Sequence, residues 1–388
     1  MKKILISLLG LLLLASCGRG FVRSGNQVRI PCGETTVRLE VIAPEIVRVS
    51  VVTGGRFTER KSLSVVSRDA CTDFEVTAAM GKVRLATDSL SVEVYKASAN
   101  VNFFDAEGRP LLQNGLVGFE PIETEGRKAW SVTTRFDAGP DDSFYGLGQH
   151  QAGEFDHRGR NEELYQYNTK VSVPFVASTG GYGLLFDHYS LSRWGNPYPY
   201  RQLADVFSVY DKDGMEGALT GTYRPSAAPV LVRREDSLYF ENEALIRNLP
   251  DVSLNGANVV YEGYLEAPET ADYQFIQYYA GFQRTWIGGT EVMSRRWRPA
   301  WNPNSYKFTV HLEKGVRTPV RVEWEPDGDV SYIGLRVAQP LSSEESDGIA
   351  FWSEFEPQAD FYFIAGRSYD EIIRAYRRLT GKAPVMPK

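Results

Sequence analysis

Residues 37–51 read Val-Arg-Leu-Glu-Val-Ile-Ala-Pro-Glu-Ile-Val-Arg-Val-Ser-Val. Apolar and polar residues alternate on both sides of Pro44. That proline marks a turn, because its nitrogen carries no hydrogen to donate to a neighbouring strand. A period of two is typical of antiparallel strands that turn one face to a core and the other to solvent. The stretch therefore predicts two half-buried antiparallel strands separated by a turn.

The same alternation recurs along most of the chain, for example at Leu90, Val92 and Val94. The 388 residues include 35 Gly, 20 Pro and 12% aromatic residues, which is typical of many short strands and turns. This composition excludes disorder, a coiled coil and a disulfide-dense miniprotein. We predict a mainly β protein, in which an N-terminal β-sandwich is interrupted by a second β-sandwich module and one C-terminal helix follows.

Proline-containing segments that indicate loops lie near both ends of residues 217–340, so the second sandwich is expected within these limits. The first sandwich is then expected at 18–216 plus 341–366, and residues 367–388 are expected to form a helix and a linker. Ser368 and Glu371 have the spacing of a capping box, in which both side chains bind free backbone amides of the first turn. The apolar face of this helix comprises Tyr369, Ile372, Ile373, Tyr376 and Leu379.

The N-terminus has the features of an export signal. Two lysines precede an apolar run over residues 4–15, and this run is too short to span a bilayer stably. Leu14-Ala15-Ser16-Cys17 resembles the bacterial lipobox, so residues 1–17 are expected to be a lipoprotein signal peptide with Cys17 as the lipidated residue. An ordinary secretory signal is the alternative. We expect an exported lipoprotein of a Gram-negative bacterium, anchored by lipid in the outer membrane or periplasm.

The net charge and the positions of the histidines and cysteines limit which ligands and cross-links are expected. Lys+Arg 43 against Asp+Glu 49 gives a net charge of −6, which argues against nucleic acid as a partner. The four histidines show no metal-ligand spacing and no CxxC pair exists, so we expect no metal and no cofactor. After export, Cys32 and Cys71 could form a disulfide, and two buried unpaired thiols are the alternative.

Several motifs occur together in a fixed order: residues 144–149 (Phe-Tyr-Gly-Leu-Gly-Gln), 164–175, 181–187, 360–366 and 373–384. This series resembles the N-terminal sandwich of glycoside hydrolase family 31 and the link from that sandwich into the catalytic barrel. Within the family, it most resembles the bacterial α-xylosidases. The resemblance covers about residues 26–216 and 341–388. It implies a retaining α-glycosidase, with an aspartate nucleophile and a second carboxylic acid as the proton donor.

The resemblance also implies that both catalytic carboxylates lie on loops of a (β/α)₈ barrel. Such a barrel takes about 250 residues of alternating strand and helix, and this chain shows no such pattern. We therefore expect no catalytic residue in this chain, which is interpreted as the front part of a longer enzyme. The expected substrate class is a xyloglucan-type oligosaccharide, and the missing barrel is an expected partner. The alternatives are a stand-alone glycan-binding lipoprotein and a truncation product, which would expose the helix face at Ile372, Ile373 and Tyr376.

The insertion has its own likeness. Residues 263–273, 286–289 and 320–324 resemble the protective-antigen 14 kDa module, a β-sandwich inserted in many carbohydrate-active enzymes. Calcium-dependent lectin versions carry an adjacent acidic pair where this chain has Tyr-Tyr-Ala-Gly at 278–281. The resemblance therefore does not extend to calcium-mediated sugar binding.

Two groups of side chains are candidates for sugar contact. In the family, the loop after Gly148 leans over the barrel mouth, so Phe155, Tyr167 and Asn168 are substrate-loop candidates, with strand capping as the alternative for the last two. We interpret the acidic residues of that loop as solvated. The glycan-stacking candidates in the insertion are Trp297, Trp301 and Trp286, and a core position is the expected alternative for Trp286.

Overall fold

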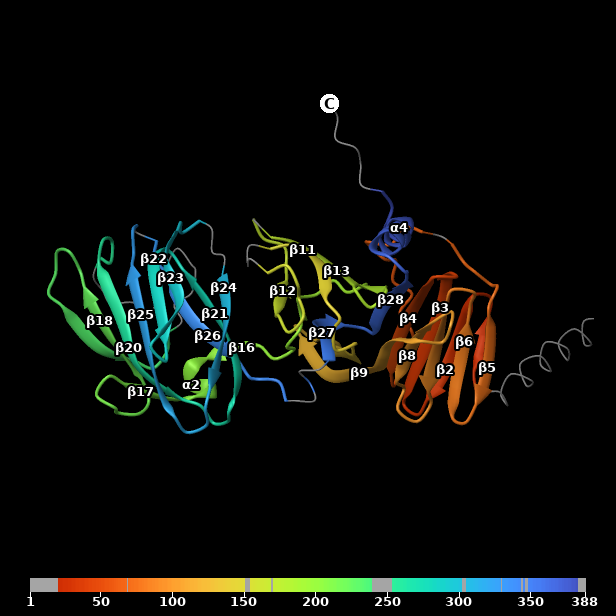
Figure 1. Ribbon diagram of the computed structural model, residues 1–388, viewed down its shortest axis with the longest axis horizontal. Helices are drawn as coiled ribbons and strands as arrows, with labels where there is room; N and C mark the ends of the chain where they lie inside the picture. The colour runs from red at the N-terminus through yellow and green to blue at the C-terminus, as the bar shows by residue number, and fades with distance from the viewer. Residues whose placement is uncertain are drawn as a thin grey trace, which may run out of the picture. The chain divides into compact units, whose positions relative to one another are not determined.

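The computed structural model describes residues 20–67, 69–150, 154–168, 170–238, 253–301, 305–328, 330–342, 345 and 348–382. These residues form two compact units, each described by itself (Figure 1). The larger unit comprises the described residues up to Gln149, those of Glu154–Pro197 and those from Ser342 onward. The smaller unit comprises the described residues of Tyr198–Leu341, together with His150. Residues 1–17, with the expected lipidation site Cys17, lie outside the described residues.

The larger unit is a sandwich of two antiparallel sheets (Figure 1). The first sheet has the strand order β1 (Val22–Ser24), β2 (Gln27–Cys32), β3 (Thr35–Ala43), β4 (Ile46–Thr53), β28 (Ala359–Ala365), β14 (Tyr182–Phe186), β13 (Val171–Ser178) and β11 (Phe144–Gln149). The second has the order β12 (Glu162–Leu164), β15 (Ser192–Trp194), β27 (Gly348–Glu356), β10 (Arg127–Asp137), β9 (Pro110–Thr124), β8 (Val101–Asp105), β7 (Leu90–Tyr95), β6 (Lys82–Ala86) and β5 (Glu75–Ala79).

The alternating stretch at 37–51 forms β3 and β4, which pair antiparallel. Val37 lies opposite Val51 and Leu39 lies opposite Val49, so the apolar residues of both strands share the face that is fully buried. The two sheets meet through aromatic rings: Phe103 of β8 stacks on Phe363 of β28 with centroids 4.0 Å apart. The two predicted strands are confirmed, and their apolar faces form the core between the sheets. Their polar face is not solvated as expected, because Arg38 and Ser50 are buried and Arg38 pairs with Glu59 at 2.8 Å.

The smaller unit is a second sandwich of antiparallel sheets. One sheet has the order β16 (Tyr200–Gln202), β26 (Ile333–Ala338), β21 (Ala271–Tyr279) and β24 (Ser305–Leu312). The other has the order β19 (Leu231–Glu235), β18 (Leu219–Arg224), β20 (Asn258–Glu266), β25 (Arg317–Glu325), β22 (Gly281–Ile287) and β23 (Thr290–Arg298), with β17 (Ser208–Asp211) paired to β20. Phe275 and Leu335 of the first sheet share a core with Tyr261 and Trp324 of the second.

The smaller unit begins at Tyr198, earlier than the boundary expected at 217. The reason is strand pairing, since β16 pairs with β26 and β17 pairs with β20. The short helix α2 (Leu203–Val206) joins these two strands. The smaller unit ends at Leu341, and the limit expected from the sequence is 340.

The helix α4 (Tyr369–Thr380) confirms the helix expected near the C-terminus. The Ser368 hydroxyl accepts a hydrogen bond from the Glu371 amide, and the Glu371 carboxylate accepts one from the amide of Arg367. Helix α4 lies beside β28 (Figure 1), and Ile372 and Leu379 are buried where α4 packs on β28 and β14. The sandwich therefore covers most of the apolar face of α4.

The possible disulfide between Cys32 and Cys71 is not formed. Cys32 and Cys71 are both free, Cys32 is buried, and burial raises the pKa of its thiol. Cys32 belongs to the sandwich core and Cys71 packs against that core. Both residues are therefore unpaired, as in the alternative interpretation, but only Cys32 is buried and Cys71 is half-buried.

Candidate functional site

A strand irregularity sets the position of the loop that carries the first candidates. The pairing of β11 with β13 shifts register between Gly146 and Gly148. Gly146, Leu147 and Gly148 have φ values of 142°, 62° and 97°, and the Leu147 side chain is buried. A Cβ on Gly148 would lie 1.9 Å from the carbonyl oxygen of Val171. The Gly-Leu-Gly sequence is thus required by a β-bulge, which turns the chain into the following loop.

The described part of that loop is bound to the start of β11. The Asp156 carboxylate accepts hydrogen bonds from the amides of Phe144 (2.9 Å) and Arg158 (3.0 Å). Burial alone would raise the pKa of Asp156, but these bonds and one from the Ser143 hydroxyl lower it. The Trp194 indole donates to the carbonyl of His157 at 3.0 Å. These contacts hold the loop at the edge of the sandwich.

Of the acidic loop residues expected to be solvated, Glu154, Asp156 and Glu163 are partly exposed, but Glu162 is not solvated. Glu162 is buried, with an oxygen 3.7 Å from the Lys170 ammonium, and His157 is buried as well. Glu163 lies 3.4 Å from the guanidinium of Arg193. Each of these two carboxylates of β12 therefore has a nearby cation as its counter-charge.

The substrate-loop candidates lie on two separate segments. Phe155 is 81% exposed, and its ring lies 5.0 Å from that of Tyr145, which in turn lies 5.9 Å from the ring of Tyr369 on α4. Tyr167 and Asn168 are both exposed, at the turn closed by an isolated bridge between Tyr167 and Lys170. Phe155 therefore belongs to an exposed aromatic row that reaches α4, whereas Tyr167 and Asn168 form a hairpin tip.

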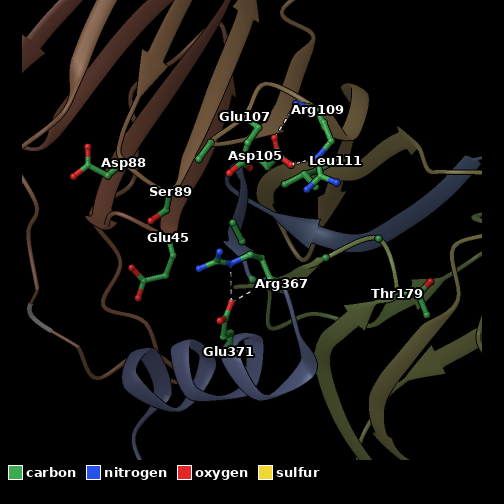
Figure 2. Close-up of a pocket in the computed structure, with 15 residues that line it drawn as sticks. Glu45, Asp88, Ser89, Asp105, Glu107, Arg109, Leu111, Thr179, Arg367 and Glu371 are labelled. Atoms are coloured by element: carbon green, nitrogen blue, oxygen red, sulfur yellow. Dashed lines mark hydrogen bonds and ion pairs between the residues drawn. The ribbon is translucent and has the colours of Figure 1, made fainter.

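A polar cavity of about 440 Å³ lies at one end of the larger unit, beside the N-terminus of α4 (Figure 2). Seven ionisable side chains line it: Glu45, Asp88, Asp105, Glu107, Arg109, Arg367 and Glu371. Asp105 and Arg109 pair at 2.6 Å. Burial opposes ionisation of Asp105, but its bonds from the Arg109 amide and side chain lower its pKa. Sequence reasoning missed this cavity because its walls are turns far apart in the chain.

The three tryptophan candidates lie on or next to one sheet of the smaller unit. Trp297 is 51% exposed and Trp301 is 69% exposed. Trp297 lies directly across from Phe282, and its indole N–H donates to the Asp327 carboxylate. Trp286 is half-buried with the Arg284 guanidinium 4.6 Å from its ring. The expected core position of Trp286 was wrong, because Thr285 and Ile287 on either side take the inward places of β22.

The described residues contain neither a cluster of metal-ligating side chains nor a membrane-spanning helix. In that part of the chain, no three His, Cys, Asp or Glu side chains gather in a way that could hold a metal ion. None of the described helices is both long enough and apolar enough to cross a bilayer.

Comparisons with known proteins agree with this architecture. Residues 36–194 match the family model of the glycosyl hydrolase 31 N-terminal galactose mutarotase-like domain. The sequence of the chain is 32% identical to that of the GH31 alpha-xylosidase of Xanthomonas citri, and its structure superposes on the crystal structure of that enzyme with a TM-score of 0.88. That match covers 94% of this chain and 41% of the other.

Two curated relatives match parts of the chain. An alpha-xylosidase of Saccharolobus solfataricus is 29% identical over 177 residues, which are 41% of this chain and 23% of the relative. An uncharacterized family 31 glucosidase of Pseudescherichia vulneris is 43% identical over 68 residues, or 18% of this chain and 11% of the relative. The chain thus spans less than half the length of each of these proteins.

Residues 36–194 of the larger unit therefore match the N-terminal domain of glycoside hydrolase family 31. Within that family, the chain is similar to α-xylosidases.

Proposed function

We propose that this chain is the accessory N-terminal part of a lipid-anchored retaining α-glycosidase, an α-xylosidase acting on xyloglucan-type oligosaccharides. The observation that carries the proposal is the match to the Xanthomonas citri alpha-xylosidase, which includes nearly the whole of this chain but under half of that enzyme. The two catalytic carboxylates of a retaining glycosidase lie about 5–5.5 Å apart, and on this proposal both belong to a barrel that follows α4.

The larger unit would support such a barrel in two ways. Helix α4 is fixed by its buried face and by its last turn, since the amides of Val66 and Ser67 both donate to the carbonyl of Leu379 at 3.0 Å. The chain therefore leaves the sandwich in a defined direction. The exposed Phe155 and the hairpin tip at Tyr167 and Asn168 offer an aromatic face and an amide to a sugar near the barrel mouth.

The proposal includes a role for the smaller unit and an anchor. We take the smaller unit to be a protective-antigen-type module that holds glycan, with Trp297 and Trp301 as stacking side chains and Trp286 as a weaker third. The anchor is a lipid on Cys17. A Cys17→Ser variant would then lose incorporation of labelled palmitate and leave the membrane fraction, and unchanged incorporation would contradict the lipid anchor.

The substrate is tested on the longer gene product. Incubated with xyloglucan oligosaccharides, it is expected to release xylose, detected by anion-exchange chromatography. Release of glucose from maltose in preference to xylose would contradict the proposed specificity.

A stand-alone glycan-binding lipoprotein is the second candidate function, favoured by the exposed Trp297 and Trp301. The helix face distinguishes the candidates only in part, because Ile372 is buried while Ile373 remains 40% exposed. A stop codon directly after Lys388, with no barrel behind it, would favour this second function.

A further inference from the structure

A second cavity of the larger unit, of about 450 Å³, has a different chemistry from the one in Figure 2. We call it the tyrosine groove. Three segments form it: the strand-free stretch after β4, the connection between β12 and β13 together with the start of β13, and the stretch from the end of β14 into β15. Its lining residues are Leu63, Ser64, Leu164, Tyr165, Gln166, Ser172, Pro174, His188, Tyr189, Ser190, Leu191 and Ser192. The size falls within the roughly 300–1,000 Å³ of small-molecule sites.

None of these lining residues is an acid, a lysine or an arginine. The only titratable group besides the tyrosines is His188, whose Nε2 accepts from the Asp360 amide at 3.0 Å. Its Nδ1–H therefore points to the Ser353 hydroxyl, 2.7 Å away, and the imidazole is neutral. Burial also lowers the pKa of His188. The groove is thus uncharged, whereas the cavity of Figure 2 carries seven ionisable side chains.

Two aromatic rings stand partly exposed in the groove. Tyr165 is 38% exposed and Tyr189 is 36% exposed. The Lys170 ammonium lies 4.6 Å from the Tyr165 ring centroid, and the Arg60 guanidinium lies 4.3 Å from that of Tyr189. Neither Lys170 nor Arg60 lines the groove. The cation–π contacts that position the two rings therefore come from side chains outside the groove.

The groove is also rigid at its polar edges. The Tyr189 hydroxyl donates to the Asp187 carboxylate and accepts from the Leu63 amide at 2.7 Å. The Gln166 side chain bonds both the amide and the carbonyl of Ser172, at 3.3 and 2.9 Å. The hydroxyls of Ser64 and Tyr165 make no hydrogen bond to the described part of the protein, and so remain free to bind a ligand.

We propose that the tyrosine groove is a binding site for an uncharged pyranose oligosaccharide, with Tyr165 and Tyr189 presenting their rings to the sugar. Pyranose rings have apolar C–H faces that pack on aromatic rings and hydroxyl edges that pair with serine and tyrosine hydroxyls. A charged ligand would lose its hydration without gaining a counter-charge. The groove lies at the base of the connection between β12 and β13 whose tip carries Tyr167 and Asn168, so it would hold units of the glycan beyond that tip.

This inference rests on the proposed carbohydrate partner and is tested on the full chain. Calorimetric titration with an uncharged xyloglucan heptasaccharide is compared with titration with an oligogalacturonate of similar length. Tyr165→Ala is expected to weaken heptasaccharide binding about tenfold, because it removes one stacking ring. Tyr95→Ala is the matched control, since Tyr95 is 37% exposed and has Lys82 near its ring but does not line the groove.

Ser64→Glu provides a second variant that places a charge in the groove without removing a ring. It is expected to weaken heptasaccharide binding as Tyr165→Ala does, with a melting temperature that matches the unaltered chain. Equal affinity of Tyr165→Ala, Ser64→Glu and Tyr95→Ala would overturn the site, and so would equal affinity for the oligogalacturonate.

The absence of any heptasaccharide binding by the unaltered chain would overturn the tyrosine groove as well. Failure of the tyrosine groove can be told apart from failure of the proposed function, because the proposed function is tested separately by xylose release from the longer gene product. That release does not depend on whether the groove binds.

Discussion

Replacing Gly148 by alanine tests how the β-bulge positions the candidate loop. The residue has a φ of 97°, and an added Cβ would meet the Val171 carbonyl oxygen at 1.9 Å and the Val173 nitrogen at 2.9 Å. Positive φ costs an alanine about 1–2 kcal/mol, and forcing backbone atoms apart in a packed sheet costs roughly 1–3 kcal/mol more. We therefore expect Gly148→Ala to destabilise the protein by roughly 2–5 kcal/mol.

The assay is thermal unfolding followed by near-ultraviolet circular dichroism. At about 2–4 °C per kcal/mol for a domain of this size, the Tm should fall by roughly 4–20 °C. Gly159→Ala is the matched control, because Gly159 has a φ of 62° but no atom within 4 Å of an added Cβ. It should cost only the backbone term of about 1 kcal/mol. Equal destabilisation by the two substitutions would refute the steric argument.

Three further changes test helix packing, proton binding and the smaller unit. Ile372→Ala removes a buried side chain from the contact of α4 with the sandwich and should cost roughly 2–4 kcal/mol in urea unfolding. Ile373→Ala, at a 40% exposed position, should cost under about 0.5 kcal/mol, and equal costs would contradict the packing. The pKa of His188 is lower in the folded protein than the ordinary histidine pKa of 6.5. The stability that comes from its neutral form is therefore fully present at pH values above 6.5. As the pH falls below 6.5, the unfolded chain binds the proton first, so stability should drop by up to about 1.4 kcal/mol per pH unit. His188→Gln should remove that dependence, and an unchanged slope would contradict it. Trp297→Ala and Trp301→Ala should weaken glycan binding in calorimetric titrations, and unchanged titrations would remove both residues from the proposed site.

The fold was predictable where local sequence and tertiary packing agree. The alternation around Pro44 predicts β3 and β4, whose apolar faces then supply the core. The capping box at Ser368 predicts the start of α4 because it depends on residues three apart in the chain. The Gly-Leu-Gly motif could be recognised, but only its pairing with Val171 explains why glycine is required.

The remaining features depend on contacts between distant parts of the chain. The burial of Glu162 follows from its pairing with Lys170, and nothing local distinguishes it from a solvated acid. The early start of the smaller unit follows from the pairing of β17 with β20, whose residues lie on opposite sides of the expected boundary at 217. Both cavities are lined by segments that are far apart in the chain, so no motif marks them.

The central claim is that this chain supports a glycosidase whose chemistry lies in the segment after α4. Steady-state hydrolysis of 4-nitrophenyl α-xyloside tests it most directly, when the 388-residue chain is compared with the same chain extended by the coding sequence that follows Lys388. We expect turnover by the extended protein and none by the chain alone. Turnover by the chain alone, or none by the extended protein, would contradict it.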